Sequence, residues 1–198
     1  MNRLKKSYFE RDPITLARDL IGCRFVRIID GIEIVGEITE TEAYGDATDL
    51  ASHARFGETK RNNVMFHDEG ILYIYQIYGI FYLTNIVAGP TGKPGAVLIR
   101  SAQIIKGMER AQEMTNQSKF VKANKDLAIG PGKFSLAFGM NKAVNGISLT
   151  DSSTVFIEAK EGTPDIIESK RIGVDYAGKS ANLRWRFYNA NNEAVSKR

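Results

Sequence analysis

The chain has 198 residues, of which 43% are hydrophobic and 25% are charged. This length and composition are typical of one globular domain, expected to span residues 1–198, and not of a disordered protein. The 27 lysines and arginines outnumber the 23 aspartates and glutamates, and the resulting net charge of +4 permits a nucleic-acid partner without requiring one.

Scarce cysteine and histidine exclude several kinds of site. Cys23 is the only cysteine, so no disulfide can form within the chain, and its apolar neighbours favour a buried thiol over a nucleophile. Two histidines and one cysteine cannot form a thiolate-rich zinc site.

No apolar run reaches the roughly 18 residues of a membrane span, and the basic start is not followed by the apolar core of a signal peptide. We therefore expect a cytoplasmic protein with no membrane partner.

The first forty residues predict a helix and a β-hairpin. Asp12-Pro13 is a typical helix start, with Asp12 as the N-cap, and Gly22 is placed to end the helix. Strands are expected at 24–29 and 32–41, because Asp30-Gly31 between β-rich runs is the strongest short-range hairpin signal.

The middle of the chain predicts an irregular segment followed by three strands. Residues 45–63 have no periodicity, and such a long irregular segment in a compact domain is usually functional or disordered. Aromatic-rich strands are expected at 71–78 and 81–87, and another at 96–100 after a loop of glycines and prolines.

The last hundred residues mix helices and short strands. A helix is expected at 104–114, a polar and mobile segment at 118–125, and a short helix at 134–140 after a break in the chain at 130–133. Short strands are expected at 148–149, 155–159 and 185–188. Hairpins combined with separate helices predict the α+β class, as a single domain with a mostly antiparallel sheet.

The strand that begins near Ile34 ends in acidic side chains. Period-two alternation puts one set of side chains on a single face: Ile34, Gly36, Ile38, Glu40, Glu42 and Tyr44. The apolar start predicts that this face points into the core, where a carboxylate must be paired or hydrogen-bonded. A core-facing strand that ends in carboxylates breaks the usual pattern, and such exceptions are typical of functional sites. The alternative is a strand end in solvent, with both glutamates hydrated.

Tyrosines are concentrated beside the irregular basic segment: Tyr44, Tyr73, Tyr75, Tyr78 and Tyr82. A single tyrosine in a strand usually only packs, but aromatic rings among arginines and lysines offer stacking surfaces for bases and cations for phosphates. His53 taken alone favours a surface or structural role. The segment 130–133 lacks the Walker spacing, so triphosphate binding is not expected, whereas Lys133 at a helix N-terminus could hold a DNA phosphate.

Taken in order, these motifs resemble the alkyladenine (3-methyladenine) DNA glycosylase family. The most specific segments are 40–44, which reads Glu-Thr-Glu-Ala-Tyr, and 75–79, which reads Tyr-Gln-Ile-Tyr-Gly. Further matches cover nearly the whole chain: 16–22, His53, Arg61-Asn62, Asn85, 97–100, 130–133 and 171–174. Lys60 departs from the family pattern, where proline is common, and this change should affect loop rigidity more than chemistry.

The resemblance implies a monomeric enzyme with one mixed α/β domain around a curved antiparallel sheet, and with no metal or other cofactor. Its partner would be double-stranded DNA that contains a damaged purine. The enzyme would flip out alkylated or deaminated purines, the class of 3-methyladenine, 7-methylguanine, hypoxanthine and ethenoadenine, and cut the N-glycosidic bond.

The resemblance also implies the roles of the residues around the reacting bond. Glu42 would be the general base that activates water, and Arg100 and the backbone carbonyl of Ile172 would help to hold that water. The flipped base would lie among three side chains, Tyr44, His53 and Tyr75.

Four further residues would recognise the duplex and exclude normal bases. Asn85 would crowd the exocyclic amine of guanine, and Tyr78 would enter the minor groove from the hairpin tip and fill the gap left in the stack. Arg61 and Lys133 would contact the DNA. A wedge lowers the cost of base extrusion, which is a few kcal/mol.

The charge of the substrate fits a site with one working carboxylate. An N-alkylated purine is cationic, so flanking aromatic faces attract it by roughly 0.5–2 kcal/mol per ring. A positive leaving group departs without an acid, so one carboxylate can suffice where sugar hydrolases usually use two. Hypoxanthine is neutral and needs protonation, by a donor that the sequence does not identify.

The turn at Tyr78-Gly79 tests this assignment of residues. A plain two-residue turn would pair Tyr75 with Tyr82 and leave Asn85 on the opposite face of the sheet. We expect a turn with an odd number of residues, or a bulge; a three-residue turn over 78–80, for example, pairs Tyr73 with Asn85.

Two other functions fit the same residues. One is a non-catalytic nucleic-acid-binding protein that uses the tyrosines as a stacking platform. The other is a hydrolase of free nucleosides, which would act without duplex and show little effect of salt on substrate capture.

Overall fold

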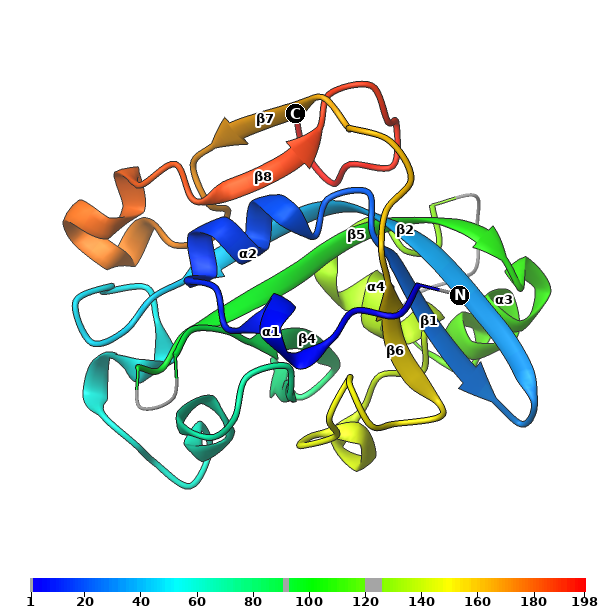
Figure 1. Ribbon diagram of the computed structural model, residues 1–198, viewed down its shortest axis with the longest axis horizontal. Helices are drawn as coiled ribbons and strands as arrows, with labels where there is room; N and C mark the ends of the chain where they lie inside the picture. Colours follow the sequence, from blue (N-terminus) through cyan, green and yellow to red (C-terminus); the bar gives the residue numbers. More distant parts are fainter. Residues whose placement is uncertain (1, 91–92, 120–125) are drawn as a thin grey trace.

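A curved antiparallel sheet organises the chain, and β2 is its longest strand (Figure 1). The structure is a computed structural model that describes residues 2–90, 93–119 and 126–198. The strands are β1 (Arg24–Ile29), β2 (Ile32–Tyr44), β3 (Leu72–Ile77), β4 (Phe81–Val87), β5 (Ala96–Lys106), β6 (Val155–Glu158), β7 (Ile166–Ser169) and β8 (Arg186–Asn189).

Short helices cover this sheet. The α-helices are α1 (Lys6–Phe9), α2 (Pro13–Asp19), α3 (Met108–Asn116) and α4 (Pro131–Ala137). Among the described residues, further helices have 3-10 geometry: η1 (His53–Phe56), η2 (Asn63–Phe66), η3 (Lys142–Val144) and η4 (Asp175–Asn182). The single α+β domain predicted from the sequence is confirmed.

Strand β2 joins the two parts of the sheet. One edge pairs with β5 from Val35 to Tyr44, and the sheet continues through β4 to β3. The other edge pairs first with β1 and then, from Glu40 to Glu42, with β8. The second half of β2 therefore has a strand on both sides, and every residue from 38 to 43 is buried. Exposure does not alternate along this half as the period-two pattern predicts.

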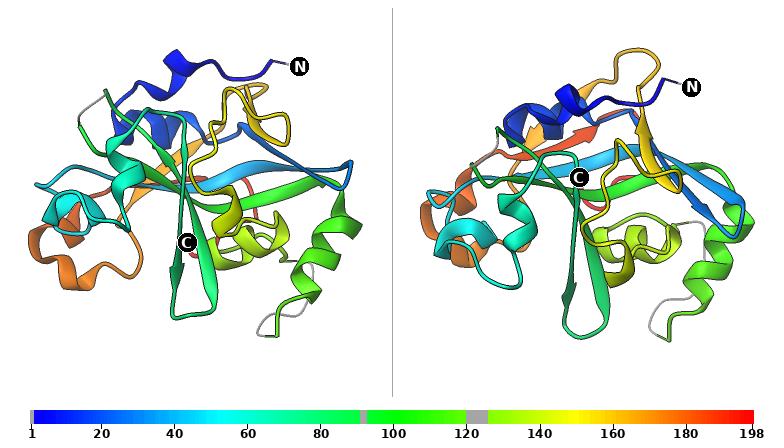
Figure 2. Two further views of the ribbon diagram at one scale, coloured as in Figure 1. Left: turned by 90° about the horizontal axis from the view of Figure 1, so that it is seen from below. Right: turned by 60° about the horizontal axis from the view of Figure 1, so that its bottom comes forward.

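Helices lie on both sides of the sheet. In Figure 2, α1 and α2 lie on one side of β2 and β5, and α4 and the β3–β4 hairpin lie on the other. The buried core joins apolar residues of α2 and α4 to the strands, and Phe25 makes edge contacts with Phe134 and Phe138. Because the core is shared by both sides of the sheet, the position of β2 is set by packing from both directions.

The local signals near the N-terminus are confirmed. The Asp12 side chain accepts hydrogen bonds from the backbone N–H groups of Ile14 and Thr15, each at 3.0 Å, and so caps α2. Asp30 and Gly31 both have positive φ, 52° and 77°, as a two-residue hairpin turn requires.

The second hairpin confirms the predicted odd turn. Ile77 pairs with Phe81, so three residues (78–80) form the turn, and Tyr73 pairs with Asn85. Tyr78 and Gly79 have φ of 52° and 68°. Positive φ is rare for a bulky residue such as tyrosine. The Tyr78 ring lies exposed at the tip of the hairpin. Tyr75 and Asn85 therefore face the same side of the hairpin.

Two predicted helix starts are wrong. Residues 104–106 belong to β5, because Ile104 and Lys106 pair with β2, and the helix begins only after Gly107. Gly107 has a φ of 75°, and a Cβ there would lie 2.3 Å from the carbonyl oxygen of Glu33, so this position needs glycine. Residues 131–133 do not break the chain but form the first turn of α4, where proline fits because its missing N–H would have no partner.

Other differences are smaller. At 148–149 there is only an isolated bridge between Ser148 and Ile71, and β7 and the 3-10 helices have no counterpart among the predicted elements. The expected mobile segment at 118–125 falls mostly on residues 120–125, which lie outside the described residues. No helix in the described ranges combines the length and the apolar character needed to cross a membrane.

Gly36 is predicted to be irreplaceable for packing. A Cβ at this position would lie 2.6 Å from the Phe138 ring and 3.0 Å from the Ala102 side chain, both buried. Gly36→Ala should lower the free energy of unfolding by about 1–3 kcal/mol in urea titrations. The double variant with Phe138→Leu should lose less than the sum of the two single variants, and strict additivity would contradict this contact.

Candidate active site

Two bulges bring Glu40 and Arg100 together. The pairing of β2 with β5 passes from Ile38–Ala102 to Glu40–Ser101, so Thr39 is an extra residue in β2. It then passes to Thr41–Ile99, so Arg100 is an extra residue in β5. A bulge redirects side chains that regular pairing would alternate. Here the result is that Arg100 reaches both glutamates of β2.

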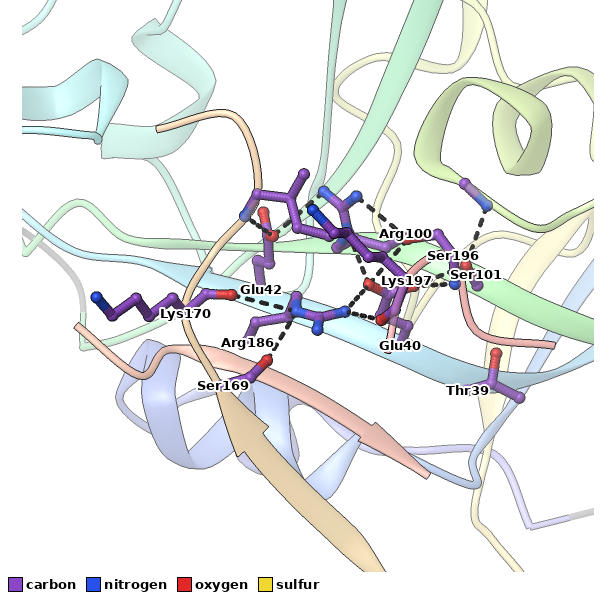
Figure 3. Close-up of polar contacts among 12 residues, drawn as sticks. Thr39, Glu40, Glu42, Arg100, Ser101, Ser169, Lys170, Arg186, Ser196 and Lys197 are labelled. Atoms are coloured by element: carbon purple, nitrogen blue, oxygen red, sulfur yellow. Dashed lines mark hydrogen bonds and ion pairs between the residues drawn. The ribbon is translucent and has the colours of Figure 1, made fainter. Parts of the chain in front are cut away.

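Glu42 is fully buried and held by three donors, among them Arg100 (Figure 3). Its Oε1 accepts from the backbone N–H of Ile172 at 2.8 Å and lies 3.2 Å from Nη1 of Arg100, while its Oε2 accepts from the Tyr44 hydroxyl at 2.8 Å. Burial raises the pKa of Glu42 above its ordinary value, although Arg100 and the two hydrogen bonds act to lower it. The result is an oriented carboxylate with increased affinity for a proton.

Glu40, two residues earlier, has a different environment. It is also fully buried, but it accepts hydrogen bonds from four residues that surround it: Arg100, Ser101, Arg186 and Ser196. Burial alone would raise the pKa of Glu40, but Arg100, Ser196 and Arg186 outweigh it, so this pKa is lowered. Both glutamates are buried and paired, so the alternative of a hydrated strand end is wrong.

Three aromatic side chains pack together beside Glu42. His53 Nδ1 lies 2.8 Å from the Tyr73 hydroxyl, and the His53 ring meets the Tyr75 ring edge-on, with centroids 4.5 Å apart. We call His53, Tyr73 and Tyr75 the aromatic cluster. Burial is the largest cause of the raised pKa of Tyr44, and the electrostatic effects of Glu42 and Tyr75 raise it further. Tyr44 thus bonds Glu42 directly, His53 contacts Tyr75, and Tyr75 lies within electrostatic range of both Tyr44 and Glu42.

A second buried ion pair holds the backbone that contacts Glu42. Arg171 and Asp49 have no exposed side-chain surface and form two parallel N–H···O contacts of 2.6 and 2.8 Å. Arg171 also donates to the backbone carbonyl of Ala43 at 2.9 Å. Asp49 in turn accepts from the backbone of the irregular segment at Gly45 and Ala51. This pair fixes Ile172, the next residue, against Glu42.

Asn85 and Arg61 lie at the borders of the aromatic cluster. Asn85 is buried, and its amide donates to the backbone carbonyl of Tyr73 at 3.1 Å, which holds it on the Tyr75 side of the hairpin. The exposed Arg61 has its guanidinium 5.2 Å from the centroid of the Tyr75 ring and donates to the carbonyl of Gln76.

Tyr78 and Lys133 are set apart from this group. Tyr78 is 88% exposed, at the tip of the hairpin that projects from the body of the molecule in Figure 2. Lys133 lies in the first turn of α4, and its neighbour Gly132 packs against Phe81 of the hairpin. No hydrogen bond or ion pair among the described residues joins Lys133 to the residues around Glu42.

The sequence analysis assigned no specific site role to several residues that build this site, although it named Tyr73 among the tyrosines and Arg171 within the segment 171–174: Asp49, Tyr73, Arg171, Arg186 and Ser196. Tyr73 alternates with Tyr75 on one face of β3, so its place beside His53 had a sequence signal. The ion pair of Asp49 and Arg171 joins residues 122 positions apart, and no local pattern indicates such a contact. In the described residues, no group of histidine, cysteine and carboxylate side chains could hold a metal ion.

Comparisons with known proteins give the family. The model of the methylpurine-DNA glycosylase (MPG) family matches residues 7–193. The chain is 38% identical to a protein of Methanocella arvoryzae over 98% of this chain and 96% of that protein. It is 35% identical to a protein of Clostridium perfringens over 99% and 100% of the two lengths. Both relatives carry the name "Putative 3-methyladenine DNA glycosylase".

The protein is thus a DNA glycosylase of the base excision repair class. The chain belongs to the methylpurine-DNA glycosylase family. The resemblance seen in segments 40–44 and 75–79 is confirmed.

His53 is predicted to be neutral at physiological pH. Burial, Arg61 and Arg55 lower its pKa to about 4 from 6.5. As the pH falls, the imidazole of His53 takes up a proton in the unfolded chain before it does so in the folded chain. Its contribution to the free energy of unfolding is therefore fully present above pH 6.5 and is lost as the pH falls through about 4. An NMR titration of His67→Gln, which leaves one histidine, should give a midpoint near 4, and a midpoint near 6.5 would contradict the buried position.

Proposed function

We propose that this DNA glycosylase excises alkylated and deaminated purines from duplex DNA and leaves an abasic site. The observation that carries the proposal is Glu42, a buried carboxylate held by three donors beside Tyr44, Tyr75 and His53. The substrate class is that of 3-methyladenine, 7-methylguanine, hypoxanthine and ethenoadenine.

Glu42 is the proposed general base. It takes a proton from a water molecule whose oxygen bonds to the anomeric carbon of the sugar, while the purine leaves with the electrons of the N-glycosidic bond. A base works best when its pKa approaches the working pH, and burial moves the pKa of Glu42 in that direction. Arg100, 3.2 Å from Glu42, and the backbone carbonyl of Ile172 are the proposed supports of the water.

The aromatic side chains are the proposed binding site of the flipped purine. Tyr44, His53 and Tyr75 offer rings to a flat and often cationic base, and each ring face attracts a cation by roughly 0.5–2 kcal/mol. A neutral His53 supports this role because it adds no repulsion against a positive purine. Asn85, fixed by its bond to Tyr73, is the proposed barrier to the exocyclic amine of normal guanine.

The projecting hairpin is the proposed wedge into the duplex. Tyr78 is exposed at its tip and enters the minor groove to fill the gap left by the extruded nucleotide. Arg61, beside Tyr75, and Lys133, next to the glycine that packs against Phe81 beside the hairpin turn, contribute positive charge for the DNA backbone. The enzyme acts as a monomer, since one chain supplies every residue of the proposed site.

The decisive test is Glu42→Gln. Excision of 7-methylguanine from duplex DNA should fall by about 10²–10⁴-fold in single-turnover assays, because the amide cannot accept the proton. Binding to the lesion duplex should survive. Glu37→Gln, on the same strand, is the matched control and should keep the wild-type rate. Unchanged release by Glu42→Gln would remove this residue from the role of base and with it the proposed function.

Tyr78 gives an independent test of the wedge. Tyr78→Ala should slow excision from duplex DNA by about ten- to a hundredfold, since unstacking a base costs a few kcal/mol. Tyr78→Phe keeps the ring and meets the same positive φ, so it should stay close to wild type. Equal rates for the Ala and Phe variants would show that the ring has no part in extrusion.

A further inference from the structure

Glu40 has no capacity left for a substrate. Its Oε1 accepts from Nε of Arg100 at 2.9 Å, Nη1 of Arg186 at 2.6 Å and Oγ of Ser196 at 3.0 Å. Its Oε2 accepts from Oγ of Ser101 at 2.9 Å and the backbone N–H of Ser196 at 2.8 Å. A carboxylate offers about four lone-pair positions, and here five donors surround it. Glu40 is therefore saturated, ionised and unsuited to a second catalytic role.

Arg100 connects Glu40 to Glu42. Its Nε bonds Glu40, its Nη2 donates to Oγ of Ser196 at 3.3 Å, and its Nη1 lies 3.2 Å from Oε1 of Glu42 (Figure 3). The guanidinium is planar, so fixing two of its nitrogens sets the direction of the third. Glu40 and Ser196 thus decide where Arg100 meets Glu42.

The segment 194–198 completes this arrangement. The Thr39 hydroxyl donates to the carbonyl of Ala194, Val195 is buried, and Nη1 of Arg186 donates to the carbonyl of Lys197 at 2.7 Å. These contacts place Ser196 where its hydroxyl accepts from Arg100 and donates to Glu40. In Figure 3, Ser196 and Lys197 lie over the strands that carry Glu40 and Arg100.

We propose that Glu40 and Ser196 are positioning residues that orient Arg100 toward Glu42, so that the segment 194–198 is a working part of the active site. The inference rests on the proposed role of Glu42 as the base. It assigns the two glutamates of β2 different tasks, Glu42 accepting the proton and Glu40 holding the arginine beside it.

The test compares two serines that contact neighbouring arginines. Ser196 and Ser169 are both half-buried, but the Ser169 hydroxyl contacts Arg186, at 2.8 Å, and neither Arg100 nor Glu40. Ser196→Ala should slow single-turnover excision of 7-methylguanine on the order of tenfold, because a small misplacement of a supporting group is costly. Ser196→Thr, which keeps the hydroxyl, should restore the rate, and Ser169→Ala should stay within about twofold of wild type.

A pH profile separates positioning from a merely structural role. 7-Methylguanine is cationic while bonded to the sugar and leaves as a neutral purine without an acid, so the acid limb of its excision reports ionisation of Glu42 and should lie above pH 4.5 in the wild type. Repulsion from Glu40 contributes to that upward position. Glu40→Gln removes this small repulsion but also releases Arg100, whose charge lowers the pKa of Glu42 more strongly, so the acid limb should move to higher pH while the reaction slows. A structural role would reduce only the amount of folded enzyme and leave the limb in place.

The outcomes distinguish this inference from the proposed function. If Glu42→Gln is inactive while Ser196→Ala matches Ser169→Ala, the positioning role is overturned and the base remains. If Glu42→Gln is active, the proposed function fails first. Removing the charge of Glu40 leaves buried arginines uncompensated, and if that variant does not fold, the serine pair decides the question alone.

Discussion

The burial of ionised side chains at the end of β2 is the constraint on which the active site depends. A carboxylate taken out of water costs several kcal/mol unless charged and polar partners surround it. Glu40 and Glu42 are both fully buried, and Arg100 and Arg186 supply the opposite charges. Because these partners come from β5 and β8, the site exists only once the sheet has assembled around β2.

Two carboxylates on one strand acquire different properties from their partners. Glu40 has five donors and a lowered pKa, whereas Glu42 has three and a raised pKa. Their separation is two residues, and the bulges on either side of Glu40 bring Arg100 between them. Neighbouring groups whose environments push their pKa values apart are a recurring basis for dividing chemical roles. The proposed division into a base and a positioning residue follows from this asymmetry.

Local features of the fold were predictable because their causes are local. The cap at Asp12 and the turn at Asp30-Gly31 depend on neighbouring residues only, and both are as expected. The odd turn of the second hairpin also followed from the requirement that Tyr75 and Asn85 share a face. The helix predicted from residue 104 failed because pairing with β2 outweighed helical spacing, and Gly107 set the boundary instead.

The sequence by itself determined the family, through motifs spread along the chain. It also determined the contact within the motif at 40–44, since Glu42 and Tyr44 are close in the chain and bond directly. Only the tertiary structure decided what neutralises these charges. Ser196 meets Glu40 across 156 positions, and Arg171 meets Asp49 across 122. Charged residues occur throughout the chain, and spacing along it carries no record of such distant pairs. Strand pairing and burial select them, because an unpaired charge in the core is too costly to keep.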